Sequence, residues 1–145
     1  RIVCCDGSVK NLVSAGLEPY AIVGDMDSLP EDLSARFADR LFPDDDQETN
    51  DLTKAVKWCS KRGYNDILIL GATGKREDHT LGNISLLADY AKDVSVIMVS
   101  DTGTIMPLLQ PGSVLSFAGQ QVSVFSLDPF AEVTSIMMIA HRIKK

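Results

Sequence analysis

The sequence has no long hydrophobic run, no excess of positive charge and few cysteines, and each absence excludes a class of protein. The longest apolar stretches, such as residues 67–70 and 96–99, are only as long as a strand, so no membrane-spanning helix is expected. The net charge of −6 disfavours a nucleic-acid partner. The three cysteines, Cys4, Cys5 and Cys59, form no Cys-x-x-Cys pair. This argues against a zinc ribbon or a disulfide framework and favours a reducing, cytoplasmic setting.

The chain does contain an alternation of strand-like and helix-like segments up to about Asp101. Its clearest predicted helix is residues 50–62, where Asn50 suits the N-cap and Gly63 the stop. Strands are expected at residues 2–5, 20–23, 66–70 and 94–99. Helices are expected at residues 8–15, 30–38, 50–62 and 80–91. This alternation predicts an α/β fold with a doubly wound, mostly parallel sheet.

Two of these segments carry detailed expectations about burial. The continuous apolar run of residues 66–70 is typical of a strand buried on both faces of a parallel sheet. The helix at residues 80–91 is expected to turn one side to the core. That side carries Leu81, Ile84, Leu87 (or Ala88) and Ala91.

After Asp101 the pattern changes to short apolar runs separated by turn residues. The runs cover residues 105–109, 114–117, 122–127 and 136–140. Glycines and prolines punctuate them, as in a set of short antiparallel strands. The sequence therefore predicts two domains: an α/β domain at residues 1–101 and a small antiparallel β domain at residues 102–145.

Two acidic clusters follow predicted elements of the α/β domain. The first cluster is Gly24–Ser28, directly after an expected strand. Its Asp25 and Asp27 are two positions apart, so both carboxylates could reach one divalent cation. A solvated turn is the alternative. The second cluster, residues 44–51, has five acids in eight positions before the best helix. Alone it reads as a charged surface loop, but mutual repulsion between its acids favours a metal shared with the first cluster.

A glycine-containing loop, residues 71–79, lies between the strand at residues 66–70 and the next helix. Its small residues allow the backbone to approach phosphates, and Lys75 and Arg76 add positive charge. The spacing is not that of a P-loop. Such strand-to-helix turns are common, so this loop alone is a weak signal.

Taken together and in this order, the motifs resemble those of the thiamine pyrophosphokinase family. The resemblance rests on Asp6-Gly7, on Gly24-Asp25-Met26-Asp27-Ser28, on residues 46–54 (DQETNDLTK) and on residues 71–79 (GATGKREDH). It covers residues 3–100 well and the C-terminal part loosely. It implies a Rossmann-like domain that binds ATP with Mg²⁺, and a β-sandwich domain that helps to bind thiamine across a homodimer interface.

The resemblance also implies roles for individual residues. Asp25, Asp27 and Asp51 would hold Mg²⁺ and serve catalysis. The implied ATP contacts are Asp6, Ser28, Gly74, Arg76, Asp78 and His79. No thiamine-binding residue can be assigned from the sequence.

The implied reaction is transfer of the pyrophosphoryl group of ATP to the thiamine hydroxyl, giving thiamine diphosphate and AMP. Two alternatives use the same residues: a non-catalytic module that senses nucleotide or thiamine, and a Mg²⁺-dependent phosphohydrolase. Family members usually have one more strand before Ile2 and further strands after Ser135. We therefore expect segments to be missing before Arg1 and after about Ser135, and an intact mass near 15.8 kDa would contradict this.

Overall fold

The computed structural model describes residues 1–126 and 130. The chain divides into two compact units, Arg1–Leu109 and Gln110–Lys145, and each is described by itself. The strand expected at residues 136–140 lies outside the described residues. The boundary expected near residue 101 stays a prediction.

The first sheet consists of β1 (Val3–Cys5), β2 (Ala21–Gly24) and β3 (Leu41–Pro43), all parallel and in that order. Side chains alternate along β2, so Ile22 faces one side while Ala21 and Val23 face the other. All three are buried because helices cover both sides of the strand. β3 was not predicted, since its short apolar run carries little sequence signal.

Helices α1 (Val9–Ser14) and α2 (Glu31–Arg36) pack on the Ile22 side of this sheet. The opposite side is covered by α3 (Asp51–Ser60), through Ala55, Trp58 and Cys59. The helix expected at residues 50–62 is thereby confirmed, and so is its cap: the Asn50 side chain accepts a hydrogen bond from the Thr53 backbone N–H.

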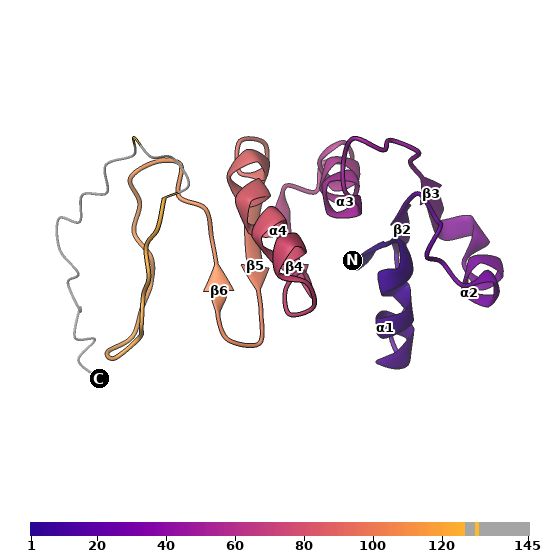
Figure 1. Ribbon diagram of the computed structural model, residues 1–145, viewed down its shortest axis with the longest axis horizontal. Helices are drawn as coiled ribbons and strands as arrows, with labels where there is room; N and C mark the ends of the chain where they lie inside the picture. The colour runs from indigo at the N-terminus through magenta and orange to yellow at the C-terminus, as the bar shows by residue number, and fades with distance from the viewer. Residues whose placement is uncertain (127–129, 131–145) are drawn as a thin grey trace. The chain divides into compact units, whose positions relative to one another are not determined.

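The second sheet pairs β4 (Asp66–Leu70) with β5 (Ser95–Val99) in parallel, and β5 with β6 (Thr104–Ile105) antiparallel. Helix α4 (Glu77–Tyr90) packs on it together with α3. Figure 1 shows α3 between the two sheets, and its residues contribute to the core on each side. The α/β class and the parallel pairing are confirmed, with two three-stranded sheets in the described part of the chain.

Two burial expectations were wrong. Leu68 and Leu70 of β4 are exposed, because the helices of this sheet cover the opposite face, on which Ile69 is buried. Leu81 is 69% exposed, because the buried residues of α4, Leu87 and Tyr90, lie in its second half.

Of the run expected at 105–109, only Ile105 belongs to β6. The described residues beyond β6 contain no assigned strand, although strands were expected at 114–117 and 122–127, of which residue 127 lies outside the described residues. Their large apolar side chains face solvent: Leu115 is 99% exposed and Phe117 is 72% exposed. A strand pair without a buried face is marginally stable in water, which is the physical reason for this difference. Among the described residues, no helix is long and apolar enough to cross a membrane.

Candidate functional site

The first site residue, Asp6, lies where β1 ends and turns into a short 3₁₀ segment (Asp6–Ser8). It is only 2% exposed, and its φ of 31° places the backbone in the left-handed region. The Ser28 backbone N–H donates to Asp6 Oδ2 at 2.9 Å. Asp6 Oδ1 is buried and has no hydrogen-bond partner in the described part of the chain. A buried carboxylate oxygen without a partner is costly, so Oδ1 is an atom to which a ligand could bind favourably.

The turn after β2 brings two more carboxylates to the same place. The Asp27 backbone N–H donates to Asp25 Oδ1 at 3.3 Å, and the Ser28 hydroxyl donates to Asp27 Oδ1 at 3.0 Å. One carboxylate oxygen from each of Asp6, Asp25 and Asp27 lies within 4.8 Å of the others. β1 and β2 are parallel neighbours, so their carboxyl ends meet at one edge of the sheet, where α/β proteins bind ligands.

Asp51, the first residue of α3, reaches the same edge through the space left by Gly24. A Cβ added at Gly24 would lie 2.8 Å from Asp6 Cβ and 3.2 Å from Asp51 Oδ1. Glycine at this position therefore allows Asp6 and Asp51 to approach the end of β2. We call Asp6, Asp25, Asp27 and Asp51 the carboxylate cluster.

One lysine offsets part of this negative charge. Lys54 Nζ lies 3.4 Å from Asp51 Oδ1, and the Lys54 side chain is 3% exposed. A buried lysine needs a nearby anion to remain charged. The lysine was not assigned a role from the sequence. Its spacing of three residues from Asp51, on a buried helix face, is the signal that could have identified it.

The pKa values reflect this crowding of charge. Burial raises the pKa of Asp6, and the Asp51 carboxylate adds to the increase, against the hydrogen bonds from Ser28. The hydrogen bond from the Ser28 hydroxyl lowers the pKa of Asp27. Burial, followed by the Asp51 carboxylate, raises the pKa of the Cys5 thiol to about 12. A hard divalent cation suits such a set of oxygen ligands, and the residues present fit one.

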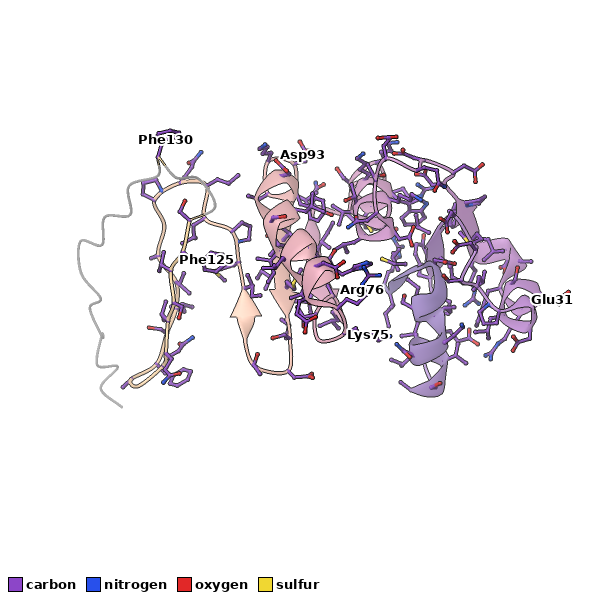
Figure 2. The ribbon with its side chains drawn as sticks, in the orientation of Figure 1. Glu31, Lys75, Arg76, Asp93, Phe125 and Phe130 are labelled. Atoms are coloured by element: carbon purple, nitrogen blue, oxygen red, sulfur yellow. The ribbon has the colours of Figure 1, made fainter. Side chains whose placement is uncertain are left out.

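The glycine loop and the start of α4 form a second group of predicted site residues. The left-handed backbone of Gly74 (φ 89°) lies in the loop that leads to Arg76, the N-cap position of α4. Arg76 donates two hydrogen bonds to the Asp78 carboxylate, including one from Nε to Oδ1 at 3.1 Å. This pairing lowers the pKa of Asp78 to about 2. Figure 2 shows the side chains of Lys75 and Arg76 at the start of α4.

α4 begins at Glu77 rather than at residue 80, so Asp78 and His79 lie in its first turn. Asp78 Oδ1 also accepts the His79 backbone N–H at 2.9 Å. Among residues 1–126, no hydrogen bond or ion pair joins Arg76, Asp78 or His79 directly to the carboxylate cluster. Asn83 of α4, which sequence reasoning did not single out, instead joins neighbours of the two groups: Ala72 in the glycine loop and Asn50, which precedes Asp51.

Asn83 connects the glycine loop to the start of α3. Its Nδ2 donates to the Ala72 carbonyl at 3.0 Å, and its Oδ1 accepts from Asn50 Nδ2 at 3.2 Å. The cap residue of α3 is therefore hydrogen-bonded to the helix that follows the loop.

A cavity of about 660 Å³ lies at the opposite edge of the first sheet. Its lining includes Ile2, Tyr20 and Arg40, which precede β1, β2 and β3 respectively. The carboxylate cluster follows strands and is not part of this lining, so the two features are separate.

Comparison with known proteins adds a family assignment for this geometry. The sequence model described as "Thiamin pyrophosphokinase, catalytic domain" matches residues 1–99. The chain is similar to thiamine pyrophosphokinase of Bacillus subtilis (strain 168), with 30% identity over 132 residues that cover 88% of this chain and 61% of the relative.

Two crystal structures of thiamin pyrophosphokinases are similar to the fold. The protein from Geobacillus thermodenitrificans matches with a TM-score of 0.56 and 33% identity, over 67% of this chain and 46% of that one. The Bacillus subtilis protein matches with a TM-score of 0.60 and 28% identity, over 68% of this chain and 49% of that one. The chain thus spans about half to three-fifths of the length of these relatives.

Proposed function

Because the chain belongs to the thiamin pyrophosphokinase catalytic-domain family, we propose that it transfers the pyrophosphoryl group of ATP to the thiamine hydroxyl. The products are thiamine diphosphate and AMP. The observation that carries the proposal is the convergence of Asp6, Asp25 and Asp27 within 4.8 Å, with one buried Asp6 oxygen left without a partner. The matching relatives support the choice of substrates.

Asp6, Asp25 and Asp27 would hold Mg²⁺, with Asp51 beside them. This differs from the set implied by the motifs alone, which gave Asp25, Asp27 and Asp51 and assigned Asp6 to the nucleotide. When bound, the ion would neutralise phosphate oxygens and withdraw charge from the phosphorus that is attacked. The backbone N–H of Ser28 orients Asp6, and the Ser28 hydroxyl orients Asp27, so this residue fixes two of the ligands.

In the proposed reaction the hydroxyl oxygen of thiamine attacks the β-phosphorus, the oxygen between the α- and β-phosphates leaves with AMP, and the hydroxyl proton is released to solvent. Charge spreads over the transferred group, so cationic side chains aimed at it lower the barrier. Arg76 is suited to this because Asp78 holds one edge of its guanidinium and leaves other N–H groups for phosphate oxygens. Gly74 and His79 lie on either side of this pair along the chain and complete the proposed ATP contacts.

Three wider features belong to the same proposal. Residues 102–145 would form the C-terminal β domain that contributes to thiamine binding, in a homodimer and in the cytoplasm. The exposed apolar residues Leu115 and Phe117 support a protein partner for this segment, and the three free cysteines support a reducing compartment. Light scattering of the purified protein would test the dimer: a monomeric mass at micromolar concentration contradicts it.

Formation of AMP and thiamine diphosphate from ATP, thiamine and Mg²⁺ tests the activity directly. Equal amounts of the two products, lost on addition of EDTA, are expected. Phosphate release in the absence of thiamine would instead identify a phosphohydrolase. A folded protein that binds ATP and forms no product would identify a sensing module.

A matched pair of variants tests the carboxylate cluster. Asp27→Asn is expected to abolish transfer and to preserve the circular dichroism spectrum, because this exposed turn residue contributes little packing. Asp93→Asn removes an exposed carboxylate just before β5 and is expected to keep full activity. If Asp27→Asn unfolds the protein, Asp27 has a structural role instead.

A further inference from the structure

The hydrogen bonds that join α3 to α4 form one continuous hydrogen-bond chain, in which every donor points the same way along the series. Tyr90 Oη lies 2.6 Å from Thr53 Oγ1, and Thr53 Oγ1 donates to Asn50 Oδ1 at 2.7 Å. A hydroxyl has one proton, so Tyr90 must be the donor to Thr53. Asn50 then donates to Asn83, and Asn83 donates to the Ala72 carbonyl.

This directionality fixes the orientation of both asparagine amides. If the Asn50 amide were flipped, it would present N–H groups to the two donors of Thr53 and lose its bond to Asn83. If the Asn83 amide were flipped, it would face the Ala72 carbonyl with its own oxygen. Each amide therefore has one orientation in which all of its neighbours are satisfied. The buried end of this hydrogen-bond chain, at Thr53 and Tyr90, holds that arrangement in place.

The chain connects the two halves of the candidate site. Asn50, in the middle of this hydrogen-bond chain, immediately precedes Asp51 of the carboxylate cluster, and Asn83 bonds Ala72 in the loop that contains Gly71 and Gly74. Capping of α3 requires only Asn50 Oδ1, which accepts the Thr53 backbone N–H at 2.9 Å. The Nδ2 group of Asn50 is not needed for the cap and instead reaches α4.

We propose that Asn50 and Asn83 are positioning residues, which fix the glycine loop at residues 71–74 relative to Asp51 so that phosphates and metal-binding carboxylates are in register. The proposal rests on the proposed function for its substrate. The core shared by α3 and α4 is apolar and includes Val56, Leu87 and Tyr90. This core supplies the stability of the helix pair, whereas the exposed Asn50–Asn83 bond adds little to it. Loss of the bond should therefore affect transfer more than folding.

Two substitutions break the link at different points. Asn50→Ser keeps an oxygen that can cap α3 and removes the Nδ2 donor. Asn83→Ala removes both of the contacts made by the Asn83 amide. Asn11→Ala, which replaces an exposed asparagine of α1, is the matched control. Each variant is compared with the unmodified chain for kcat, for KM of ATP and of thiamine, for melting temperature, and for the exchange rates of the backbone amides of residues 71–74.

Both site variants are expected to lower kcat by about 10- to 100-fold, the effect of a small misplacement of reacting groups. KM for thiamine and the melting temperature should change little, and amide exchange in the loop should become faster. The double variant should be no worse than the poorer single variant, because both act on one link. The control should match the unmodified chain in every measurement.

Unchanged loop exchange, unchanged kcat or additive losses in the double variant would overturn the proposal. A fall in melting temperature that accounts for the lost activity would do so as well. If the unmodified chain forms no thiamine diphosphate, the proposed function fails by itself. The positioning role is then decided by loop exchange and by the affinity for ATP with Mg²⁺, which should weaken in both site variants and not in Asn11→Ala.

Discussion

Lys54 Nζ lies 3.4 Å from Asp51 Oδ1, and the two side chains differ sharply in exposure, at 3% for the lysine and 35% for the aspartate. The ammonium group is therefore enclosed by the protein while its partner still reaches the surface edge of the sheet. This arrangement places one fixed positive charge behind a cluster of acids. It balances part of the cluster and leaves the outward-facing oxygens free for a ligand.

Substitution of Lys54 should destabilise the protein, because the lysine offsets repulsion between the acids of the carboxylate cluster. Lys54→Met keeps most of the unbranched side chain and removes its charge. The expected loss in the free energy of unfolding is about 1–3 kcal/mol, below the roughly 3–5 kcal/mol of a fully buried pair, since Asp51 is partly solvated. Urea unfolding in the presence of EDTA measures it.

Mg²⁺ distinguishes repulsion from simple loss of packing in this variant. If repulsion dominates, added Mg²⁺ should raise the melting temperature of Lys54→Met by more than it raises that of the unmodified chain. An equal shift in the two proteins would contradict this explanation. Lys57→Met, at an exposed position of the same helix, is the control and should show neither effect.

The buried carboxyl of Asp6 should make the folded protein less stable as the pH rises. Its pKa is raised in the folded state, chiefly by burial. Its contribution to stability is therefore fully present below the ordinary pKa of 3.8 and is lost as pH rises through the higher folded-state pKa. Asp6→Asn removes this loss and can still accept the Ser28 backbone N–H.

The metal-free Asp6→Asn variant is consequently expected to be more stable than the unmodified chain at pH 7. This advantage should narrow as the pH falls toward 4, the approximate ordinary pKa of an aspartate. Chemical denaturation at several pH values, with EDTA throughout, tests this. A variant that is less stable at pH 7 would show that Asp6 is stabilised in its charged form. With Mg²⁺ added, the order should reverse if the ion binds Asp6.

Gly24 should not tolerate a side chain. Its φ of 153° is rarely adopted by other residues, and an added Cβ would lie 2.8 Å from Asp6 Cβ. Gly24→Ala is expected to cost about 1–3 kcal/mol through overpacking and to separate Asp6 from Asp51. Thermal unfolding and Mg²⁺ titration measure the two effects.

Gly16→Ala separates backbone strain from this clash. Gly16 also has a positive φ, of 76°, but an added Cβ there would meet nothing within 4 Å. It should cost about 1–2 kcal/mol from the left-handed backbone alone and leave Mg²⁺ binding intact. Weakened Mg²⁺ binding in both alanine variants would indicate a general effect of instability.

The cysteines should be inert in the folded protein. Burial is the leading cause of the raised pKa of Cys4, Cys5 and Cys59, and the pKa of Cys5 reaches about 12. At pH 8 the Cys5 thiolate fraction is then only about 10⁻⁴. Iodoacetamide at pH 8 should label none of the three thiols in the native protein and all three in guanidinium, as read by mass spectrometry. Rapid native labelling of Cys4 or Cys5 would show that the first sheet opens readily.

Much of the α/β unit could be predicted from local patterns. β4 has the predicted bounds because its apolar run is continuous, and α3 begins after its predicted cap because it has a clear hydrophobic period and a capping residue. β3 was missed because it has three residues and a weak pattern. Leu81 was misplaced because periodicity shows which residues share a helix face and not how far the neighbouring core extends.

The site shows the same division between local and distant information. The pairing of Asp25 with Asp27 is a property of one turn and could be predicted. Asp6 joins them only because β1 and β2 are parallel neighbours, and Asn83 is important only because α4 returns alongside α3. Such contacts depend on the packing of segments far apart in the chain, for which local sequence patterns offer no signal.

α3 belongs to two of the three apolar clusters of this unit, with Val56 in one and Ala55, Trp58 and Cys59 in the other. If α3 separated from either sheet, apolar side chains of both the helix and that sheet would become exposed. Residues 1–109 should accordingly melt in a single transition, and a ligand bound at Asp51 on the first turn of α3 should delay the melting of both sheets together.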